Sequence, residues 1–135
     1  MSDGPRTYAS VCVYGDELDP QAISQALGVP PSRSGRRGDP LRKGRTVDRG
    51  FWILTTRDAG VAAEPGDSSA HLRALAAWPG LDQARLAALH EQYLVRVFVF
   101  WELQDGNGGP ELMPDALAWL VRIGAELHVD VYVGE

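Results

Sequence analysis

Seven of the thirteen basic side chains lie in one short stretch, Pro30–Gly50, with the sequence PPSRSGRRGDPLRKGRTVDRG. The whole chain has a formal net charge of −5, and the residues outside Arg33–Arg49 have a balance of −10. Guanidinium groups offer forked donors that suit carboxylates and phosphates. Because the rest of the chain repels acidic partners, we expect an acidic protein or an anionic ligand to bind here. The expected contact residues are Arg33, Arg36, Arg37, Arg42, Lys43 and Arg45.

The alternative for this segment is a solvated surface loop in which Asp39 and Asp48 pair with neighbouring arginines. Its length still favours a role in binding. About twenty residues separate the expected helix 20–27 from the expected strand 50–56, whereas connections in compact domains usually take about 4–6 residues.

A second candidate site follows from the alternation of residues in three expected strands. Tyr14, Arg96, His128 and Asp130 fall on one face of the predicted sheet, and Cys12 falls on the same face. An imidazole and a carboxylate two residues apart could serve acid–base chemistry. An enzyme with its site on this polar face is therefore the alternative to a binding protein. The plainer interpretation places His128 and Asp130 at the polar margin of a sheet.

Other chemistries find less support in the sequence. The three histidines are far apart and there is no Cys-x-x-Cys or His-x-x-x-His spacing, so we expect neither a metal nor a cofactor. The run DGNGGP lacks the Lys-Ser/Thr ending of a phosphate-binding loop and reads as a turn. The single Cys12 lies within a strand and matches no nucleophile motif.

Composition is that of an ordinary globular protein, with 135 residues, 44% hydrophobic and 23% charged. This length predicts a single domain spanning residues 1–135. We find no run of about 20 apolar residues and no signal-peptide pattern, and a lone cysteine suits a reducing compartment. A cytoplasmic protein without membrane contact is expected. The sequence leaves the oligomeric state open.

Periodicity predicts strands at 7–14, 50–56, 94–102 and 126–133. The first helix is expected at 20–27, with Asp19 as N-cap, Pro20 in the first turn and Gly28 at the C-terminal end. A last helix, 114–123, repeats this pattern with Pro114 and Gly124. Between the halves lies a helical insertion at about 68–93, which Pro79-Gly80 must break or kink.

The order β-α-β, helices, β-α-β predicts an α+β fold of the ferredoxin-like type: a (βαβ)x2 two-layer sandwich with a four-stranded antiparallel sheet in the order 4-1-3-2. Alternation predicts an aliphatic layer under the helices, made by Val11, Val13, Val97, Val99, Leu127, Val129, Val131 and Val133.

The opposite face combines aromatic and polar residues, including Phe98 and Phe100. It is either a binding surface or the floor on which the inserted helices lie. An open face of this kind would also resemble sheets that stack RNA bases, but the consensus motifs of those modules are missing and the net charge is negative. We therefore do not expect nucleic acid as the partner.

Several segments resemble a bacterial family described as domain of unknown function 4279. These are Tyr14–Pro40, the strand GFWIL, His71 in SSAHLRAL, and the closing NGGPELMPDALAWLVRIGAELHVDVYV. The resemblance extends from about Tyr8 to Val133 and supports a single domain. It implies no activity. Small bacterial families of this kind include immunity proteins encoded beside secreted toxins, so the resemblance adds an immunity-type binding role to the candidates.

Overall fold

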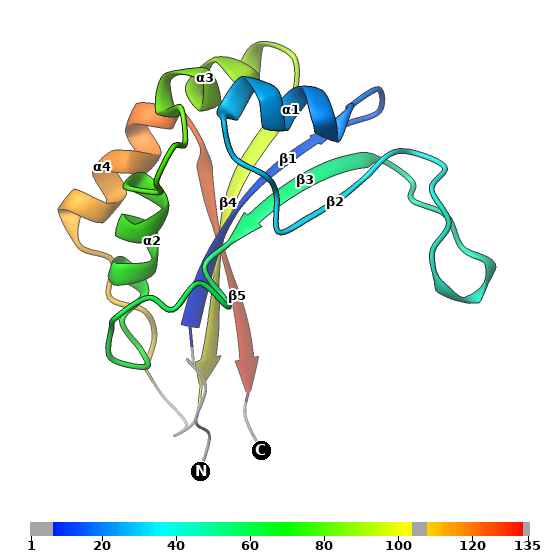
Figure 1. Ribbon diagram of the computed structural model, residues 1–135. Helices are drawn as coiled ribbons and strands as arrows, with labels where there is room; N and C mark the ends of the chain where they lie inside the picture. Colours follow the sequence, from blue (N-terminus) through cyan, green and yellow to red (C-terminus); the bar gives the residue numbers. More distant parts are fainter. Residues whose placement is uncertain (1–6, 104–107, 134–135) are drawn as a thin grey trace.

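The structure is a computed structural model that describes residues 7–103 and 108–133 (Figure 1). The first half of the predicted turn 105–110 lies outside the described residues. The α+β fold combines one mixed sheet with four α-helices in the described residues. The strands are β1 (Thr7–Gly15), β2 (Arg33–Gly35), β3 (Gly50–Thr55), β4 (Leu94–Leu103) and β5 (Glu126–Val133). The helices are α1 (Pro20–Leu27), α2 (Ser68–Ala76), α3 (Gln83–Ala88) and α4 (Pro114–Ile123), and short 3-10 turns occur at Arg42–Gly44 and Leu89–Glu91.

The five strands lie in the order β2-β3-β1-β4-β5. Strand β1 is at the centre and pairs antiparallel with both β3 and β4, so that Val11 lies between Leu54 and Val97. Strand β2 adds antiparallel to the outer side of β3, and β5 pairs parallel with β4. A parallel pair needs a crossover connection, and helix α4 supplies it here.

The predicted α+β class is confirmed, but the ferredoxin-like arrangement is not. The sheet has five strands instead of four, and one of its pairs is parallel. The central pair, strands 7–15 and 94–103, is the one expected from the order 4-1-3-2. The flanking strands are exchanged, because β3 lies beside β1 and β5 lies beside β4.

The helix boundaries follow the predicted signals. The Asp19 side chain accepts a hydrogen bond from the Gln21 amide, Pro20 is the first residue of α1, and Gly28 ends it with a positive φ of 83°. Gly124 ends α4 in the same way, with a φ of 70°. The insertion predicted at 68–93 is confirmed as α2 and α3, and Pro79-Gly80 lies in the break between them.

The core lies between the sheet and the helices. Val11, Val13, Val97 and Val99 are fully buried and belong to the same cluster as the apolar residues of all four helices. That cluster includes Ile23, Leu27, Leu72, Leu75, Leu86, Trp119 and Leu120.

The prediction was wrong for the end of the last strand. Val129, Val131 and Val133 are 40%, 56% and 77% exposed, although they continue the aliphatic face of the sheet. The physical reason is their position on an edge strand, beyond the layer of helices.

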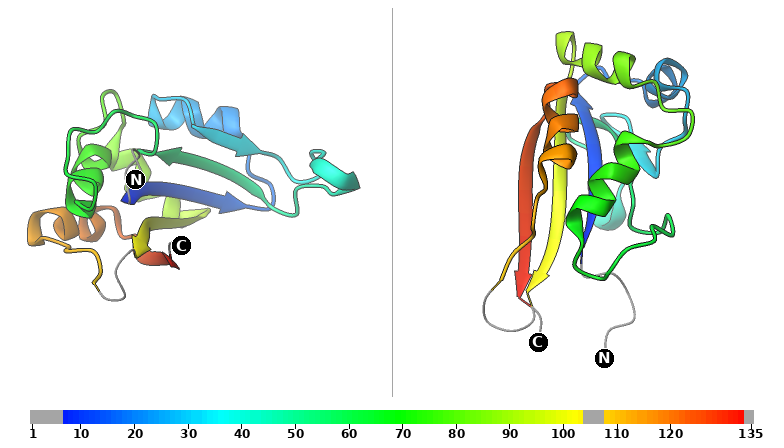
Figure 2. Two further views of the ribbon diagram at one scale, coloured as in Figure 1. Left: turned by 90° about the horizontal axis from the view of Figure 1, so that it is seen from below. Right: turned by 90° about the vertical axis from the view of Figure 1, so that its left-hand side faces the viewer.

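The helices pack against one face of the sheet, as Figures 1 and 2 show. Helix α2 joins the core through Leu72 and Leu75, and α1 is fixed by a hydrogen bond from the Trp52 indole of β3 to Ser24. The inserted helices therefore share the aliphatic face with α1 and α4. They do not cover the polar face.

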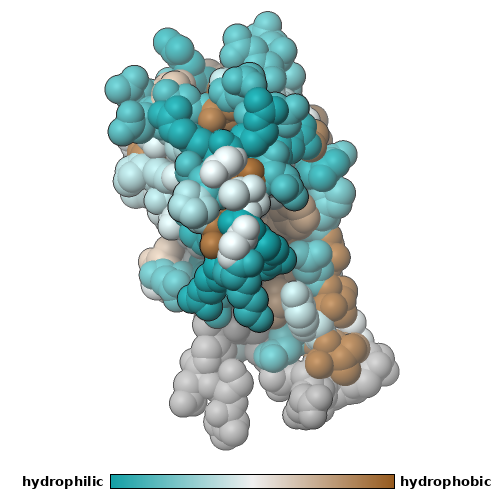
Figure 3. Space-filling view, turned by 90° about the vertical axis from the view of Figure 1, so that its right-hand side faces the viewer, coloured by the Kyte–Doolittle hydropathy of each residue, from teal (hydrophilic) through white to brown (hydrophobic). Residues whose placement is uncertain are grey.

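The basic segment 30–50 is more ordered than the predicted loop. Its residues Arg33–Gly35 form β2, a bridge joins Pro40 to Thr46, and the buried Val47 fixes its base. The tip of the basic segment extends beyond the sheet (Figure 1). The side of the molecule on which it lies is mostly hydrophilic (Figure 3).

Candidate functional site

The polar face of the sheet is formed by the even-numbered residues of β1, β4 and β5 and the odd-numbered residues of β3. Across the strands, Cys12 lies between Ile53 and Arg96, and Ser10 lies between Thr55 and Phe98. Ser10 and Cys12 are buried at the centre, while the larger side chains around them are half-buried. This face is the candidate functional site, and we call it the open face.

Two adjoining hollows follow the open face. The first, of about 380 Å³, has Ser10, Cys12 and Phe98 among its lining residues. The second, of about 770 Å³, extends under the basic segment and includes Arg45 and Thr46. Both are lined by Tyr14 and Arg33, so they form one continuous groove from the centre of the sheet to the basic segment.

Aromatic rings stack on one another along one side of this groove. The rings of Tyr8 and Phe100 lie with their centroids 4.8 Å apart, and Phe98 and His128 are stacked at 5.1 Å. Tyr132 lies 4.9 Å from Phe100, at a steeper angle. Phe100 therefore contacts a ring on either side, Tyr8 and Tyr132, and the row of rings forms one side of the groove.

Two arginines border the groove. The guanidinium of Arg33 lies 5.8 Å from the centroid of Phe51, and that of Arg57 lies 5.7 Å from the centroid of Tyr8. Within residues 7–103 and 108–133, neither arginine is in an ion pair with a carboxylate. Stacking on the rings positions both cations while their N–H donors stay available.

The predicted sheet-face residues are brought together only in part. Arg96 and His128 both bond the Glu126 carboxylate, His128 at 3.0 Å, and Asp130 is not hydrogen-bonded to His128 in the described residues. The bond from His128, together with that from Arg96, lowers the pKa of Glu126. The histidine partner is therefore Glu126, two residues before it on the same face, rather than Asp130. Sequence reasoning missed Glu126 as a member of this face.

Cys12 and Tyr14 lie two residues apart on β1, and both line the floor of the groove. Burial raises the pKa of the Cys12 thiol to about 11, and it also raises the pKa of Tyr14. Both side chains therefore stay protonated at neutral pH. A thiol with this pKa is a poor nucleophile.

The predicted basic contact residues fall into two groups. Arg36 and Arg37 form ion pairs with Asp19 and Glu17, at 2.7 and 2.8 Å, and so join the basic segment to the β1–α1 turn. A third, longer contact of 3.8 Å joins Arg49 to Asp16. The other four predicted residues are in no ion pair among the described residues: Arg33, Arg42, Lys43 and Arg45.

The local pairing expected for Asp39 takes a different form. Its carboxylate accepts a hydrogen bond from the backbone amide of Arg36, at 2.8 Å, and thus shapes the turn.

Arg57 was not predicted from the sequence, although a signal for it exists. Phe51, Ile53 and Thr55 alternate on the open face of β3, and Arg57 continues that alternation just after the strand.

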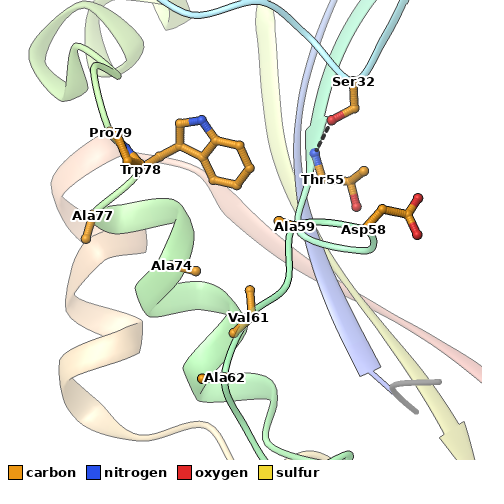
Figure 4. Close-up of a pocket in the computed structure, with 10 residues that line it drawn as sticks. All are labelled: Ser32, Thr55, Asp58, Ala59, Val61, Ala62, Ala74, Ala77, Trp78 and Pro79. Atoms are coloured by element: carbon orange, nitrogen blue, oxygen red, sulfur yellow. Dashed lines mark hydrogen bonds between the residues drawn. The ribbon is translucent and has the colours of Figure 1, made fainter. Parts of the chain in front are cut away.

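An apolar cleft at one end of the groove was also missed. It has a volume of about 700 Å³ and lies between α2, the segment after it and the loop after β3 (Figure 4). Figure 4 shows the Trp78 indole above small side chains such as Ala74 and Val61. Ser32 and Thr55, which are hydrogen-bonded at 3.0 Å, line both this cleft and the open face. The cleft and the groove therefore adjoin at these two residues.

The described part of the chain contains no group of three or more His, Cys, Asp or Glu side chains placed to hold a metal ion. None of its helices is long and apolar enough to cross a membrane.

Comparison with known proteins gives one match. Neither the curated proteins nor the solved structures contain a significant match to this chain. A family model, described as Domain of unknown function (DUF4279), matches residues 5–134. This match covers nearly the whole sequence, in agreement with the resemblance seen in its motifs, and the chain therefore belongs to the DUF4279 family.

Proposed function

We propose that this protein is a binding protein that holds an acidic segment of a partner protein in the groove of its open face. The observation that carries the proposal is the pair Arg33 and Arg57, fixed on aromatic rings at the groove without a carboxylate partner in the described residues. The unpaired cations of the basic segment extend the same surface.

Charge supports an acidic partner. Five arginines and three aspartates line the two hollows, which gives a balance of +2. With a net charge of −5 for the chain, all other residues together have a balance of −7. An acidic segment is therefore attracted to the groove and repelled by most of the remaining surface, which favours one docking orientation.

The adjoining apolar cleft supports a second feature of the partner segment, an apolar side chain. A recognised peptide commonly combines charged contacts with an apolar anchor in a pocket. The cleft beneath Trp78 adjoins the groove at Ser32 and Thr55, which line both. The partner segment is therefore an acidic one with an apolar side chain at one end. An immunity-type role is the special case in which the partner is a toxin.

Single-stranded nucleic acid fits the groove less well. Base stacking needs free aromatic faces, whereas the rings of Tyr8 and Phe100 already cover each other and the Arg57 guanidinium also lies over Tyr8. Catalysis is also less well supported, because Cys12 remains a thiol and His128 is bonded to Glu126.

The test is a titration with synthetic peptides followed by two-dimensional NMR of the ¹⁵N-labelled protein. The probes are a glutamate-rich peptide ending in leucine, the same peptide ending in glycine, and oligouridylate. We expect the leucine peptide to bind best and to shift the amides of β1, β3 and Trp78. Each added salt increment should weaken binding, because part of the attraction is between exposed charges.

Substitutions locate the binding surface. Arg33→Glu and Arg57→Glu should each reduce affinity at least fivefold, while Arg122→Glu, an equal charge change on the exposed side of α4, should have little effect. An equal loss of affinity in all three variants would show that only the net charge of the protein matters, and it would contradict the proposal. If the protein bound oligouridylate more tightly than both peptides, the partner would be a nucleic acid and not an acidic protein segment.

A further inference from the structure

The two edges of the sheet differ in how well they are protected. Edge strand β2 has only three residues, follows Pro30-Pro31 and begins with Arg33. Edge strand β5 has eight residues, ELHVDVYV, without proline, lysine or arginine. Proteins usually block an edge with short strands, prolines or charged side chains, lysine above all, because its free N–H and C=O groups pair readily with another strand. Strand β5 is long and has no proline or lysine, and its charged side chains are Glu126 and Asp130.

The side chains of β5 are also unusually apolar for an exposed edge. Val129, Val131 and Val133 are 40–77% exposed on one face, and Tyr132 is 59% exposed on the other. Within the described residues, the only strand that pairs with β5 is β4. The free edge therefore has both unpaired backbone groups and an apolar surface to cover.

We propose that β5 pairs antiparallel with β5 of a second copy of this chain, about a two-fold axis at Val129. In this register Val129 lies opposite Val129, and Leu127 lies opposite Val131 of the second copy. Both contacts lie on the helix side of the sheet. They cover Val129 and Val131, two of the three valines that the helices leave exposed.

Charge selects this register on the open face. With the axis at Val129, His128 lies opposite Asp130 of the second copy, and Glu126 lies opposite Tyr132. Each pairing occurs twice by symmetry. The His128 Nε2 bonds Glu126 of its own chain, at 3.0 Å, which leaves Nδ1 as the ring nitrogen for a hydrogen bond with the facing Asp130.

Neighbouring registers place like charges together. An axis at Asp130 would put Asp130 opposite Asp130, and an axis at His128 would put Asp130 opposite Glu126. Like charges directly opposite destabilise an antiparallel pair. Registers with the two-fold axis between two residues would bring helix-side residues opposite open-face residues. Of the three registers, the one about Val129 keeps the carboxylates of β5 from lying opposite one another and places an imidazole opposite each Asp130.

The result is a continuous ten-stranded sheet, since each copy contributes the five described strands. An in-plane pairing about a perpendicular two-fold axis leaves both open faces on the same side. This inference concerns the assembly and does not depend on what the groove binds.

Cysteine cross-linking tests the register. In an antiparallel pair, opposite Cα atoms are about 4.5–5.5 Å apart, which suits a disulfide. Val129→Cys should therefore give a disulfide-linked dimer under mild oxidation. Val131→Cys is the matched control, because its copies would be about 13 Å apart along the strands. The wild-type chain controls for Cys12, which is only 3% exposed.

Analytical ultracentrifugation tests the association itself. The wild-type chain should sediment as a dimer at high concentration, and Val131→Lys should be a folded monomer with an unchanged circular dichroism spectrum. If the wild-type chain stayed monomeric at concentrations up to about 1 mM, the proposal would be overturned. A dissociation constant of about 1 mM corresponds to a binding free energy of only about 4 kcal/mol. Equal cross-linking of the Val129→Cys and Val131→Cys variants would overturn the register.

Discussion

His71 of α2 is a buried imidazole, 4% exposed, whose Nδ1 lies 2.6 Å from the Thr56 hydroxyl oxygen. Thr56 also accepts a hydrogen bond from the Ala9 amide, at 3.0 Å, so one short network connects α2 with β1 and the end of β3. Burial lowers the pKa of His71 below its ordinary value of 6.5, with Asp67 acting in the opposite direction. The folded protein therefore holds this ring neutral.

This gives a pH dependence of stability with a definite sign. Below pH 6.5 the unfolded chain binds a proton on His71 that the folded chain resists, so the free energy of unfolding falls as the pH decreases toward the lowered folded-state pKa. His71→Asn should be less stable at neutral pH by about 1–2 kcal/mol, and it should lose part of this pH dependence. Urea unfolding at several pH values measures both effects.

His90→Asn is the control, because His90 is exposed and the substitution should leave the pH dependence intact. If wild type and His71→Asn showed the same loss of stability between neutral and acidic pH, the buried imidazole would not be its source.

Among the elements, α1 depends on a close approach between two glycines. Gly28 ends the helix with a φ of 83°, and a Cβ built there would lie 2.8 Å from the carbonyl oxygen of Gly80. The Asp82 amide also donates to the Leu27 carbonyl, at 2.9 Å. The end of α1 is therefore packed against the turn between α2 and α3.

Gly28→Ala combines left-handed strain with a backbone clash. The strain alone costs about 1–2 kcal/mol, and we expect the clash to raise the loss of unfolding free energy above that range. Gly60→Ala is the matched control, because Gly60 has a φ of 69° but open space around its Cβ position. The loss of unfolding free energy in Gly60→Ala should stay near the value expected for the strain alone. Chemical denaturation of both variants measures the difference, and equal losses would show that the Gly80 contact is unimportant.

The elements were predictable where the signal is local. Alternation located four strands, and Asp19, Pro20 and Gly28 defined α1, because caps and side-chain period act over a few residues. The order of the strands was not predictable in this way. Val129 and Val131 alternate as Val97 and Val99 do, yet only the second pair is buried. An edge strand and a central strand have the same local pattern.

The candidate site shows the same division. The polar face itself followed from alternation, and the position of the basic segment followed from the clustering of its arginines and lysine. Whether the inserted helices cover that face depends on which side Leu72 and Leu75 pack, and an apolar helix stripe fits either side of a sheet. Glu126 as the partner of Arg96 and His128, and the ion pairs of Arg36 and Arg37 with the β1–α1 turn, depend equally on distant contacts.

At the scale of the whole molecule, the buried core and the proposed binding groove lie on opposite sides of one sheet. The helix side contains the core, and the open side contains the groove with Arg33 and Arg57. Substitutions on the open side can therefore change binding while leaving the fold intact. The core on the helix side has its own boundary, which falls within β5, between the partly buried Leu127 and the exposed Val129.

Two equal substitutions test where that boundary lies. Val99 of β4 is fully buried, whereas Val131 of β5 is 56% exposed on the same face of the sheet. A charge buried without a partner costs several kcal/mol or more, which is comparable to the total stability of a small domain, about 5–15 kcal/mol. Val99→Asp should therefore unfold the protein or abolish its cooperative melt.

Val131→Asp should lower the melting temperature only slightly, because its carboxylate remains in water. Both variants are compared by circular dichroism at low protein concentration, so that association through β5 does not contribute to the melt. A cooperative, near-wild-type transition for Val99→Asp would contradict the observed packing of the sheet against the helices. A charge at an exposed edge position disrupts no core packing. If Val131→Asp nevertheless unfolded the protein, the core would have to extend outward as far as Val131.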